Sequence, residues 1–430
     1  MNLRTSRKQR VPLSKIGGTK LKKVVAVAGF LLASFSLGLI GLEIATRVFH
    51  WRPDPLMQPD ERFGFAHIPN ASGWWVNIDS PGEFQTYVHI NSKGLRDQEY
   101  SYEKPSKEFR ILVLGDSFVD ALEVPLEDSF QEVLEARLNE WQDRPLKVIN
   151  GGVWGYGNDL ELLFYRLEGY KYQPDLVLLA FQPTSDVLEN HREMETQYMG
   201  RVYKPFFVLN NGELELTNWP FPVESVESPP PQGPVEHVKA WLASHSRFYH
   251  VAGRFIKRRL GSLAGVLRGI GIMDPSERNT VANGIPMAAY LYAVDYTPQW
   301  EEAWAVTKAI VAQLNREVSA NGGRLVVLLL PDRYQVEDDY WASEQQMYPA
   351  MQEGEWDLDK PNGIMHQFLT QEGIPALEML DEFRARAQET GRPLYYSKDG
   401  HWNVEGHHLA GELLAKKLCQ EGLIPCGETN

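Results

Sequence analysis

Five short apolar runs recur along the second part of the chain. They span residues 110–114, 146–150, 175–181, 324–330 and 374–377. Stretches with the length and apolar spacing of helices lie between or after them, at residues 126–141, 159–170, 300–320 and 403–418. Continuous apolar strands that alternate with helices are typical of a parallel sheet covered on both faces. The pattern therefore predicts an α/β domain.

Two regions depart from this rhythm. Residues 52–108 are rich in aromatic, Gly, Pro and polar residues and alternate around Val88, so they predict a small β-rich segment before the α/β domain. Residues 191–298 predict an insertion within that domain, which we place at 109–420. The insertion contains a basic amphipathic stretch around Arg254 and Arg259. This stretch either forms a solvated charged face or lies on anionic lipid.

The longest apolar segment of the chain runs from Val24 to Leu42 without a charged residue and continues past Glu43 to Thr46. A helix of this length covers about 30 Å, the thickness of the hydrocarbon core of a bilayer. Eight of the 43 Lys and Arg residues precede it, and no acidic residue does. The positive-inside rule therefore predicts a cytoplasmic tail at 1–23, a single-pass signal anchor at 24–46 and a periplasmic or extracellular remainder. A cleaved signal peptide is the alternative.

Charge and cysteine content bear on the binding partners of the protein and on its compartment. The chain of 430 residues is 43% hydrophobic, and its formal net charge is −14. Because eight basic residues lie in the tail, the exported part is more acidic still, which argues against nucleic-acid binding. The two cysteines, Cys419 and Cys426, either form a small disulfide in an oxidising compartment or remain free thiols.

Two loops that follow predicted strands carry candidate chemistry. Ser117 lies in the turn Gly115-Asp116-Ser117, where its hydroxyl is presented as a nucleophile and its amide points toward an oxyanion. The glycine cluster at 151–157 lacks the glycine spacing of a dinucleotide-binding loop. We expect the amide of Gly155 to face the same oxyanion.

A third loop supplies a candidate base. His401 is the only one of the eleven histidines that lies in such a loop with an aspartate, Asp399, two residues away. A neutral imidazole oriented by a carboxylate is the usual activator of a serine hydroxyl. Trp154 and Trp402 lie within these loops and either stack on a sugar ring or pack in the core. No metal-ligand pattern is present in the sequence.

Taken together, Gly115-Asp116-Ser117, Gly155 and the Asp-x-His pair resemble the SGNH, or GDSL-like, hydrolase superfamily. The Asp-x-His spacing followed by Trp402 is similar to that of alginate O-acetylation proteins, and the run 91–97 is similar to that of membrane-anchored members. The resemblance implies a three-layer αβα flavodoxin-like fold and Ser/His/Asp acyl chemistry without metal or cofactor. Ser185 occupies the position of the family's oxyanion-hole Asn, so either its hydroxyl donates, or Asn190 compensates, or catalysis is weak.

These features predict a serine-dependent hydrolase of acyl esters. We expect it to act through an acyl-enzyme on O-acyl groups, with O-acetyl favoured, of a cell-envelope or extracellular glycan. Its partners would be an acylated carbohydrate or other small ester and the membrane that holds its anchor. An O-acyltransferase to polysaccharide is one alternative. A non-catalytic glycan-binding or assembly module with a degraded oxyanion hole is the other.

Overall fold

The computed structural model describes residues 16–426 except 79, 81, 142–143, 200–201, 226–232 and 270–280. Most of the predicted cytoplasmic tail therefore lies outside the described residues. The chain divides into two compact units, one made of residues 1–52 and 232–272 and the other of residues 53–231 and 273–430. The domain boundaries at 108 and 420 stay a prediction.

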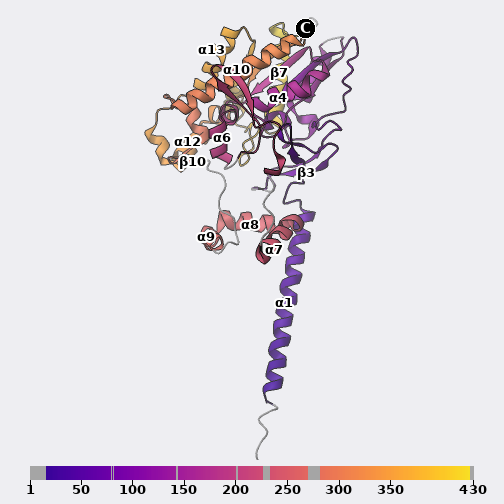
Figure 1. The fold of residues 1–430 in the computed structure, drawn as a ribbon, viewed down its shortest axis with the longest axis vertical. Coiled ribbons are helices and arrows are strands. Elements are labelled where there is room, and N and C mark those ends of the chain that lie inside the picture. The colour runs from indigo at the N-terminus through magenta and orange to yellow at the C-terminus, as the bar shows by residue number, and fades with distance from the viewer. Residues whose placement is uncertain are drawn as a thin grey trace, which may run out of the picture. The chain divides into compact units, whose positions relative to one another are not determined.

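A five-stranded parallel sheet forms the centre of the larger unit, with the strand order β13-β12-β7-β5-β6 (Figure 1). Its strands are β5 (Phe109–Leu114), β6 (Leu146–Asn150), β7 (Leu176–Phe181), β12 (Arg324–Leu329) and β13 (Ala376–Glu378). The predicted parallel sheet is confirmed. Numbered along the chain, the order is that of flavodoxin-like folds, in which the strand order reverses between the first and third strands, here β5 and β7.

Helices cover both faces of this sheet. One face packs on α3 (Phe130–Glu140), α14 (Leu380–Thr390) and α15 (Val404–Gln420). The other packs on α4 (Asn158–Leu167), α10 (Pro298–Ala320) and α13 (Lys360–Glu372). Successive strand residues point to opposite faces, so Val113 packs on the first side and Leu112 on the second. This two-sided burial explains why the strands are continuously apolar, and it confirms the three-layer fold.

Shorter elements surround this core. The β-rich segment consists of two antiparallel pairs, β1 (Met57–Asp60) with β2 (Gly64–His67) and β3 (Ser72–Val76) with β4 (Gln85–His89). Two further hairpins are β8 (Phe206–Asn210) with β9 (Glu213–Thr217) and β10 (Val281–Ala282) with β11 (Ile285–Pro286). The short helices are α2 (Ser117–Asp120), α5 (Pro183–Glu189), α6 (Arg192–Met199), α11 (Arg333–Val336) and α12 (Asp338–Met347).

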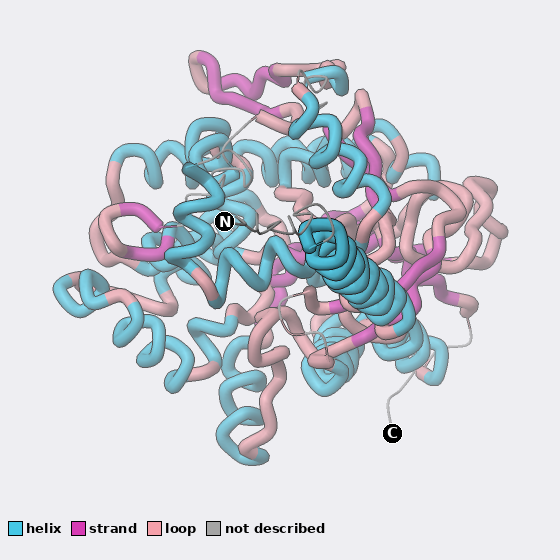
Figure 2. The backbone as a smooth tube through the Cα atoms, turned by 90° about the horizontal axis from the view of Figure 1, so that it is seen from below, coloured by secondary structure: helices cyan, strands magenta, loops and turns pink. Residues whose placement is uncertain are grey.

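The smaller unit is helical. It contains α1 (Ile16–Val48), α7 (Pro234–His245), α8 (Arg247–Arg259) and α9 (Gly261–Gly269). Figure 2 shows α1 as one continuous helix. This helix includes the apolar segment Lys22–Val48, with a hydropathy of 2.2, whose most apolar 18-residue window contains no buried residue. By length and composition this segment is able to cross a membrane, as a permanent anchor or as a signal sequence.

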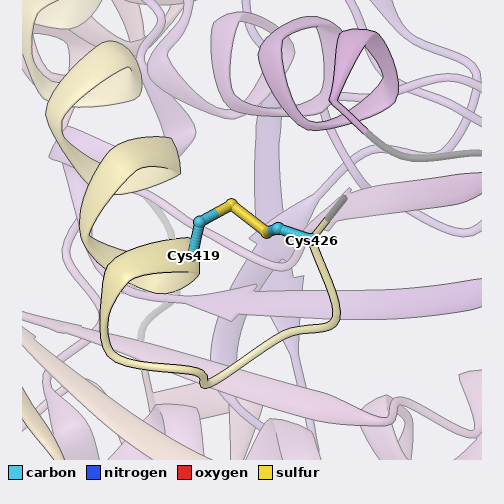
Figure 3. Close-up of a disulfide and its surroundings, with 2 residues drawn as sticks. All are labelled: Cys419 and Cys426. Carbon is cyan, nitrogen blue, oxygen red and sulfur yellow. A yellow bond between two sulfur atoms is a disulfide. The ribbon is translucent and has the colours of Figure 1, made fainter. Parts of the chain in front are cut away.

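The two cysteines are joined. Cys419 lies in the last turn of α15, and Cys426 lies on the segment that follows the helix; their sulfur atoms form a disulfide with a Cα–Cα distance of 5.6 Å (Figure 3). The bond ties the end of α15 to the last described residues. The structure thus decides a pairing that the sequence left open.

Candidate active site

Ser117 is the first residue of α2, and only Gly115 and Asp116 separate it from the end of β5. The side chain of Asp116 caps this short helix by accepting a hydrogen bond from the backbone N of Phe118 at 2.8 Å. A Cβ on Gly115 would lie 2.2 Å from the Val119 side chain, so the tight turn requires glycine here. Ser117 therefore lies between the carboxyl ends of β5 and β7, where ligands bind in open parallel sheets.

His401 lies beside the Ser117 hydroxyl although 284 residues separate them in the sequence. His401 Nε2 is 2.7 Å from Ser117 Oγ, and His401 Nδ1 is hydrogen-bonded to Asp399 Oδ1. Gly400, between the two, has a φ of +97°, which favours glycine in the turn that aims both side chains at Ser117. The structure brings together the three predicted relay residues in the order that activation of a hydroxyl requires.

A second carboxylate, Glu123, also faces the imidazole. Its Oε1 is 3.9 Å from His401 Nδ1 and accepts a hydrogen bond from Trp75 Nε1 at 3.2 Å, and its side chain is 2% exposed. Sequence reasoning missed this residue. Glu123 approaches the site because the chain leaves α2 through Ala121 in the left-handed region, at a φ of +54°, and no periodicity signals such a turn at alanine.

The carboxylates control the protonation of the site. Burial lowers the pKa of His401, but the negative charges of Glu123, Asp399 and Asp116 outweigh burial and raise that pKa to about 10. Burial raises the pKa of Glu123 to about 7. The pKa of Asp399 is lowered: burial acts to raise it, but the hydrogen bond from His401 outweighs that effect. The imidazole is therefore held largely protonated at neutral pH, and its neutral form increases as pH rises.

The same three groups raise the question of a metal. Ligand atoms of Glu123, Asp399 and His401 lie within 4.8 Å of one another. Both ring nitrogens of His401 are already engaged, one with Asp399 and the other with Ser117. This hydrogen-bond pattern matches a proton relay.

The opposite side of the hydroxyl is lined by the predicted oxyanion residues. Ser117, Gly155 and Ser185 all line one cavity of about 170 Å³, together with Trp154 and Phe65. Gly155 has a φ of +78°. Among the residues that the structure describes, neither the amide of Ser117 nor that of Gly155 has a hydrogen-bond acceptor. Both amides are thus available to an oxygen atom in this cavity.

Ser185 is engaged elsewhere. Its hydroxyl donates to Asp116 Oδ2 at 2.9 Å, and a hydroxyl has only one proton to donate. Asn190 does not compensate, because it is fully buried and its amide donates to Asn158 at 3.1 Å and Thr307 at 3.0 Å. The side chain of Asn190 serves the packing of α4, α5 and α10.

The two tryptophans have different environments. Trp154 lines the 170 Å³ cavity, as a substrate-stacking residue would. Trp402 is 0% exposed and packs against Phe118, Phe130 and Phe383, so the predicted contact with a sugar is wrong for this residue. Its indole belongs to the core beneath the His401 loop, because the residue after the base turns inward to begin the packing of α15.

A larger cavity of about 400 Å³ adjoins the first on the side of the base. Its lining includes His401, Asp399, Tyr334 and Tyr340, and it shares Ser185 with the smaller cavity. The hollow of about 490 Å³ beside β8 and β9 contains none of the candidate residues.

The run 91–97, noted in the sequence only as a family-like feature, supports two of these loops. Arg96 is 1% exposed and donates to the backbone oxygens of Asp120, Ala121 and Val124, the first at 2.9 Å. Asp97 accepts from the backbone N of Asn150 at 2.7 Å. The first contact holds the segment after Ser117, and the second holds the end of β6 ahead of the Gly155 loop.

Asp120 links the same two loops directly. Its Oδ2 accepts from the backbone N of Trp154 at 2.9 Å and lies 3.0 Å from His67 Nε2. Both side chains of this His67–Asp120 pair are fully buried. The position of Gly155 relative to Ser117 therefore depends on contacts that the β-rich segment supplies.

Comparison with known proteins agrees with this architecture. Residues 290–428, which include Asp399 and His401, match the family model of the SGNH hydrolase-like domain of the acetyltransferase AlgX. This match confirms the resemblance of the chain to the SGNH hydrolase-like domain. No curated protein sequence matches the chain.

Several solved structures are similar at low identity. An α/β hydrolase from the metagenome of Lake Arreo, Spain, is 11% identical, with 75% of this chain and 99% of that chain covered and a TM-score of 0.35. The acetyl xylan esterase AlAXEase is 9% identical, with 72% and 100% covered and a TM-score of 0.37. An acetylxylan esterase from Geobacillus stearothermophilus is 10% identical, with 75% and 97% covered and a TM-score of 0.35.

Proposed function

We propose that this protein is a serine-dependent acyl ester hydrolase that removes O-acyl groups, with O-acetyl favoured, from a glycan outside the cytoplasm. The observation that carries the proposal is the continuous hydrogen-bonded series Ser117–His401–Asp399. A serine that merely fills a turn has no need of an oriented imidazole at 2.7 Å.

The proposed mechanism has two halves. Ser117 Oγ attacks the acyl carbonyl while His401 takes its proton, and Asp399 stabilises the resulting imidazolium. The amides of Ser117 and Gly155 hold the oxyanion. Collapse of the tetrahedral intermediate breaks the ester bond, and His401 gives its proton to the departing alcohol. Water then attacks the acyl-enzyme, His401 takes the water proton, and release of the carboxylic acid returns the proton to Ser117.

The two cavities suggest how the substrate is oriented. The cavity of about 170 Å³ adjoins the two free amides, which favours it as the place for the acyl group. Typical ligand pockets hold about 300–1,000 Å³, so a smaller cavity suits a short acyl chain. The cavity of about 400 Å³ contains His401, the group that protonates the departing alcohol. Tyr334 and Tyr340 line that cavity with their rings stacked on each other, 5.4 Å between centroids, and form an aromatic wall beside the departing alcohol.

O-Acyl transfer is the second candidate. It uses the same acyl-enzyme, with a sugar hydroxyl in place of water, and the family model that matches residues 290–428 is described as an acetyltransferase. The hydrolase is favoured because its acceptor, water, needs no binding site of its own, whereas a transferase must also bind an acceptor sugar.

Membrane anchoring by α1 and an extracytoplasmic site complete the proposal. The segment Lys22–Val48 supports the anchor, and the basic residues before it support an outward-facing enzyme. The Cys419–Cys426 disulfide supports the same location, because structural disulfides persist mainly in oxidising compartments.

A fluorophosphonate probe tests the nucleophile in the full-length protein. We expect covalent labelling of the wild type and of the control Ser129→Ala, which removes another buried serine from a similar Asp-Ser-Phe triplet. Ser117→Ala should not label. An unlabelled wild type, or equal labelling of Ser117→Ala, would refute the enzyme and favour a binding or assembly module.

A second measurement separates the two reactions. The wild-type enzyme is incubated with an O-acetylated oligosaccharide, with and without an unacetylated acceptor, and free acetate and acetylated acceptor are quantified. Release of acetate at a rate that the acceptor does not change supports the hydrolase. Loss of acetate release in favour of acetylated acceptor would assign the transferase.

A further inference from the structure

We propose that α7, α8 and α9 dock on anionic phospholipid headgroups at the surface of the membrane that α1 crosses. This inference goes beyond the proposed activity and uses only the anchor from it. The docking face consists of exposed apolar side chains, namely Val235, Val238, Trp241, Phe255, Leu263 and Val266. We call this set the apolar foot.

The first observation is continuity with α1. Glu43 of α1 accepts hydrogen bonds from Ser246 Oγ at 2.8 Å and from the backbone N of Phe248 at 3.0 Å, which fixes the first turn of α8 to α1. Arg47 donates to the backbone oxygen of His245 at 2.8 Å. Figure 1 shows α7, α8 and α9 at the C-terminal end of α1.

The length of α1 places this junction at a membrane surface. Lys22 begins the apolar segment, and Glu43 lies about 30 Å further along the helix at 1.5 Å per residue, which equals the thickness of the hydrocarbon core. If Lys22 is at one surface, Glu43 and the start of α8 are therefore at the other. Helices attached at this level meet the headgroups first.

The second observation is the exposure of the apolar foot. Val235, Val238 and Trp241 recur every three residues along α7 and so share one side of that helix, with exposed fractions of 58–59%. Phe255 of α8 is 58% exposed and Val266 of α9 is 60% exposed. Exposure of large apolar side chains on three successive helices is unfavourable in water. Such exposure is typical of helices that lie in a membrane interface. Trp241 is of the residue type enriched there.

The third observation is charge. Residues 232–272 contain seven Lys or Arg and a single acid, Glu236, in a chain where 57 acids exceed 43 bases. Burial lowers the pKa of Arg52, and the nearby positive charges of Arg247 and Arg254 lower it further, which shows that cationic groups are gathered here. A net positive charge on these helices favours an anionic membrane surface. An acidic protein partner would satisfy the charges but would not require apolar residues on three helices.

Fluorescent probes on the full-length protein test the docking. The native cysteines are paired in a disulfide, so a single introduced cysteine can be labelled with the polarity-sensitive dye NBD. Phe255→Cys and Leu263→Cys report on the apolar foot, and Gln346→Cys, exposed on α12 of the other unit, is the control. In vesicles of phosphatidylcholine with phosphatidylglycerol, we expect blue-shifted emission and quenching by doxyl lipids at 255 and 263 but not at 346.

Charge dependence makes the test specific for anionic lipid. One basic residue near an anionic membrane surface changes binding about fivefold, so Lys257→Gln with Arg259→Gln should lower the docked-to-undocked ratio by about 25-fold. Vesicles of phosphatidylcholine alone and high salt should lower it as well. The matched pair Arg392→Gln with Lys416→Gln removes two exposed charges from the other unit and should have no effect.

Three results would overturn the proposal. One is unquenched emission at 255 and 263 in both kinds of vesicle. Another is quenching that neither lipid charge nor the Lys257 and Arg259 substitutions alter. The third is blue-shifted emission that doxyl lipids do not quench, which would assign the foot to a protein contact. Ester hydrolysis by the same labelled proteins is measured separately, so a failed enzyme and a failed docking surface are distinguishable.

Discussion

The two sides of the Ser117 hydroxyl are built differently. On the base side, His401 is hydrogen-bonded to Asp399 and has a second buried carboxylate, Glu123, 3.9 Å from Nδ1. On the oxyanion side, the one candidate side-chain donor, Ser185, is hydrogen-bonded to Asp116 instead. Two carboxylates thus stabilise the positive charge that forms on the imidazole. The negative charge that forms on the substrate depends on backbone amides alone.

This difference has an electrostatic consequence. Buried carboxylates that favour a protonated His401 disfavour a nearby oxyanion, because both effects act through the same low-dielectric interior. Asp116 contributes to both, since it raises the pKa of His401 and also holds the hydroxyl of Ser185. His401 is thus held in its protonated form, which cannot accept the Ser117 proton. Because the neutral form increases with pH, we expect turnover to increase with pH as well.

Removing the carboxylate that orients the base should have the largest effect. Asp399→Asn leaves a neutral amide at His401 Nδ1 and favours the wrong tautomer, so we expect kcat to fall by about 10⁴-fold. Steady-state kinetics on an O-acetylated oligosaccharide measures this. If Glu123 takes over the role of Asp399, the loss will be less than about tenfold, and the relay assigned here would be wrong.

Displacing the backbone amide should have the next largest effect. In Gly155→Ala, a side chain is forced on a residue with a φ of +78° and its Cβ lies 3.4 Å from Phe65. We expect kcat to fall about 100-fold with KM nearly unchanged, as for loss of one oxyanion donor. Gly212→Ala is the control, because Gly212 has a φ of +85° with nothing within 4 Å and lies in the β8–β9 turn. Equal activity of Gly155→Ala and wild type would contradict the role of Gly155.

Neutralising the second carboxylate should move the pH profile. Glu123→Gln removes a negative charge that raises the pKa of His401, so that pKa falls and the neutral base is present at lower pH. We expect the rising limb of kcat/KM against pH to move to lower pH. If the pKa of His401 falls by about one, activity at neutral pH should increase about tenfold. The exposed Glu127→Gln should leave the profile in place.

The Glu123 substitution also has outcomes that would contradict the assignment. A rising limb that stays in place or moves to higher pH would show that Glu123 does not act on His401. Loss of wild-type activity on treatment with a chelator would assign Glu123, Asp399 and His401 to a metal instead.

The smallest effect is expected at the position where the sequence departs from its family. Ser185→Ala should lower kcat by no more than about threefold, because the hydroxyl it removes already donates to Asp116 and is not available to the oxyanion. Loss of about 100-fold with an unchanged melting temperature would show that Ser185 turns toward the substrate during the reaction.

The prediction of the fold rested on local patterns that the tertiary structure preserves. The apolar run at 110–114 became β5, and Asn403 caps α15 by accepting from the backbone N of Gly406 at 3.1 Å. The proposed relay residues were predicted for the same reason. Asp399 and His401 are two residues apart, and only Gly115 and Asp116 separate Ser117 from a strand, so their chemistry is visible in short stretches of sequence.

The remaining features depend on packing between distant segments. Glu123 reaches His401 only because the chain reverses at Ala121, and Ser185 turns from the oxyanion only because Asp116 lies 2.9 Å away. Trp402 is hidden only because three phenylalanines from other elements surround it.

The sequence by itself thus determined the parallel α/β domain and the long apolar N-terminal segment, and it singled out Ser117, His401 and Asp399 as candidates, because periodicity and short spacings express backbone geometry and residue chemistry. The tertiary structure decided that Glu123 lies beside His401, that Ser185 donates to Asp116, that Trp402 is buried and that the two cysteines pair. These depend on distances across the fold, and such distances follow from how helices and strands pack, which no local pattern records.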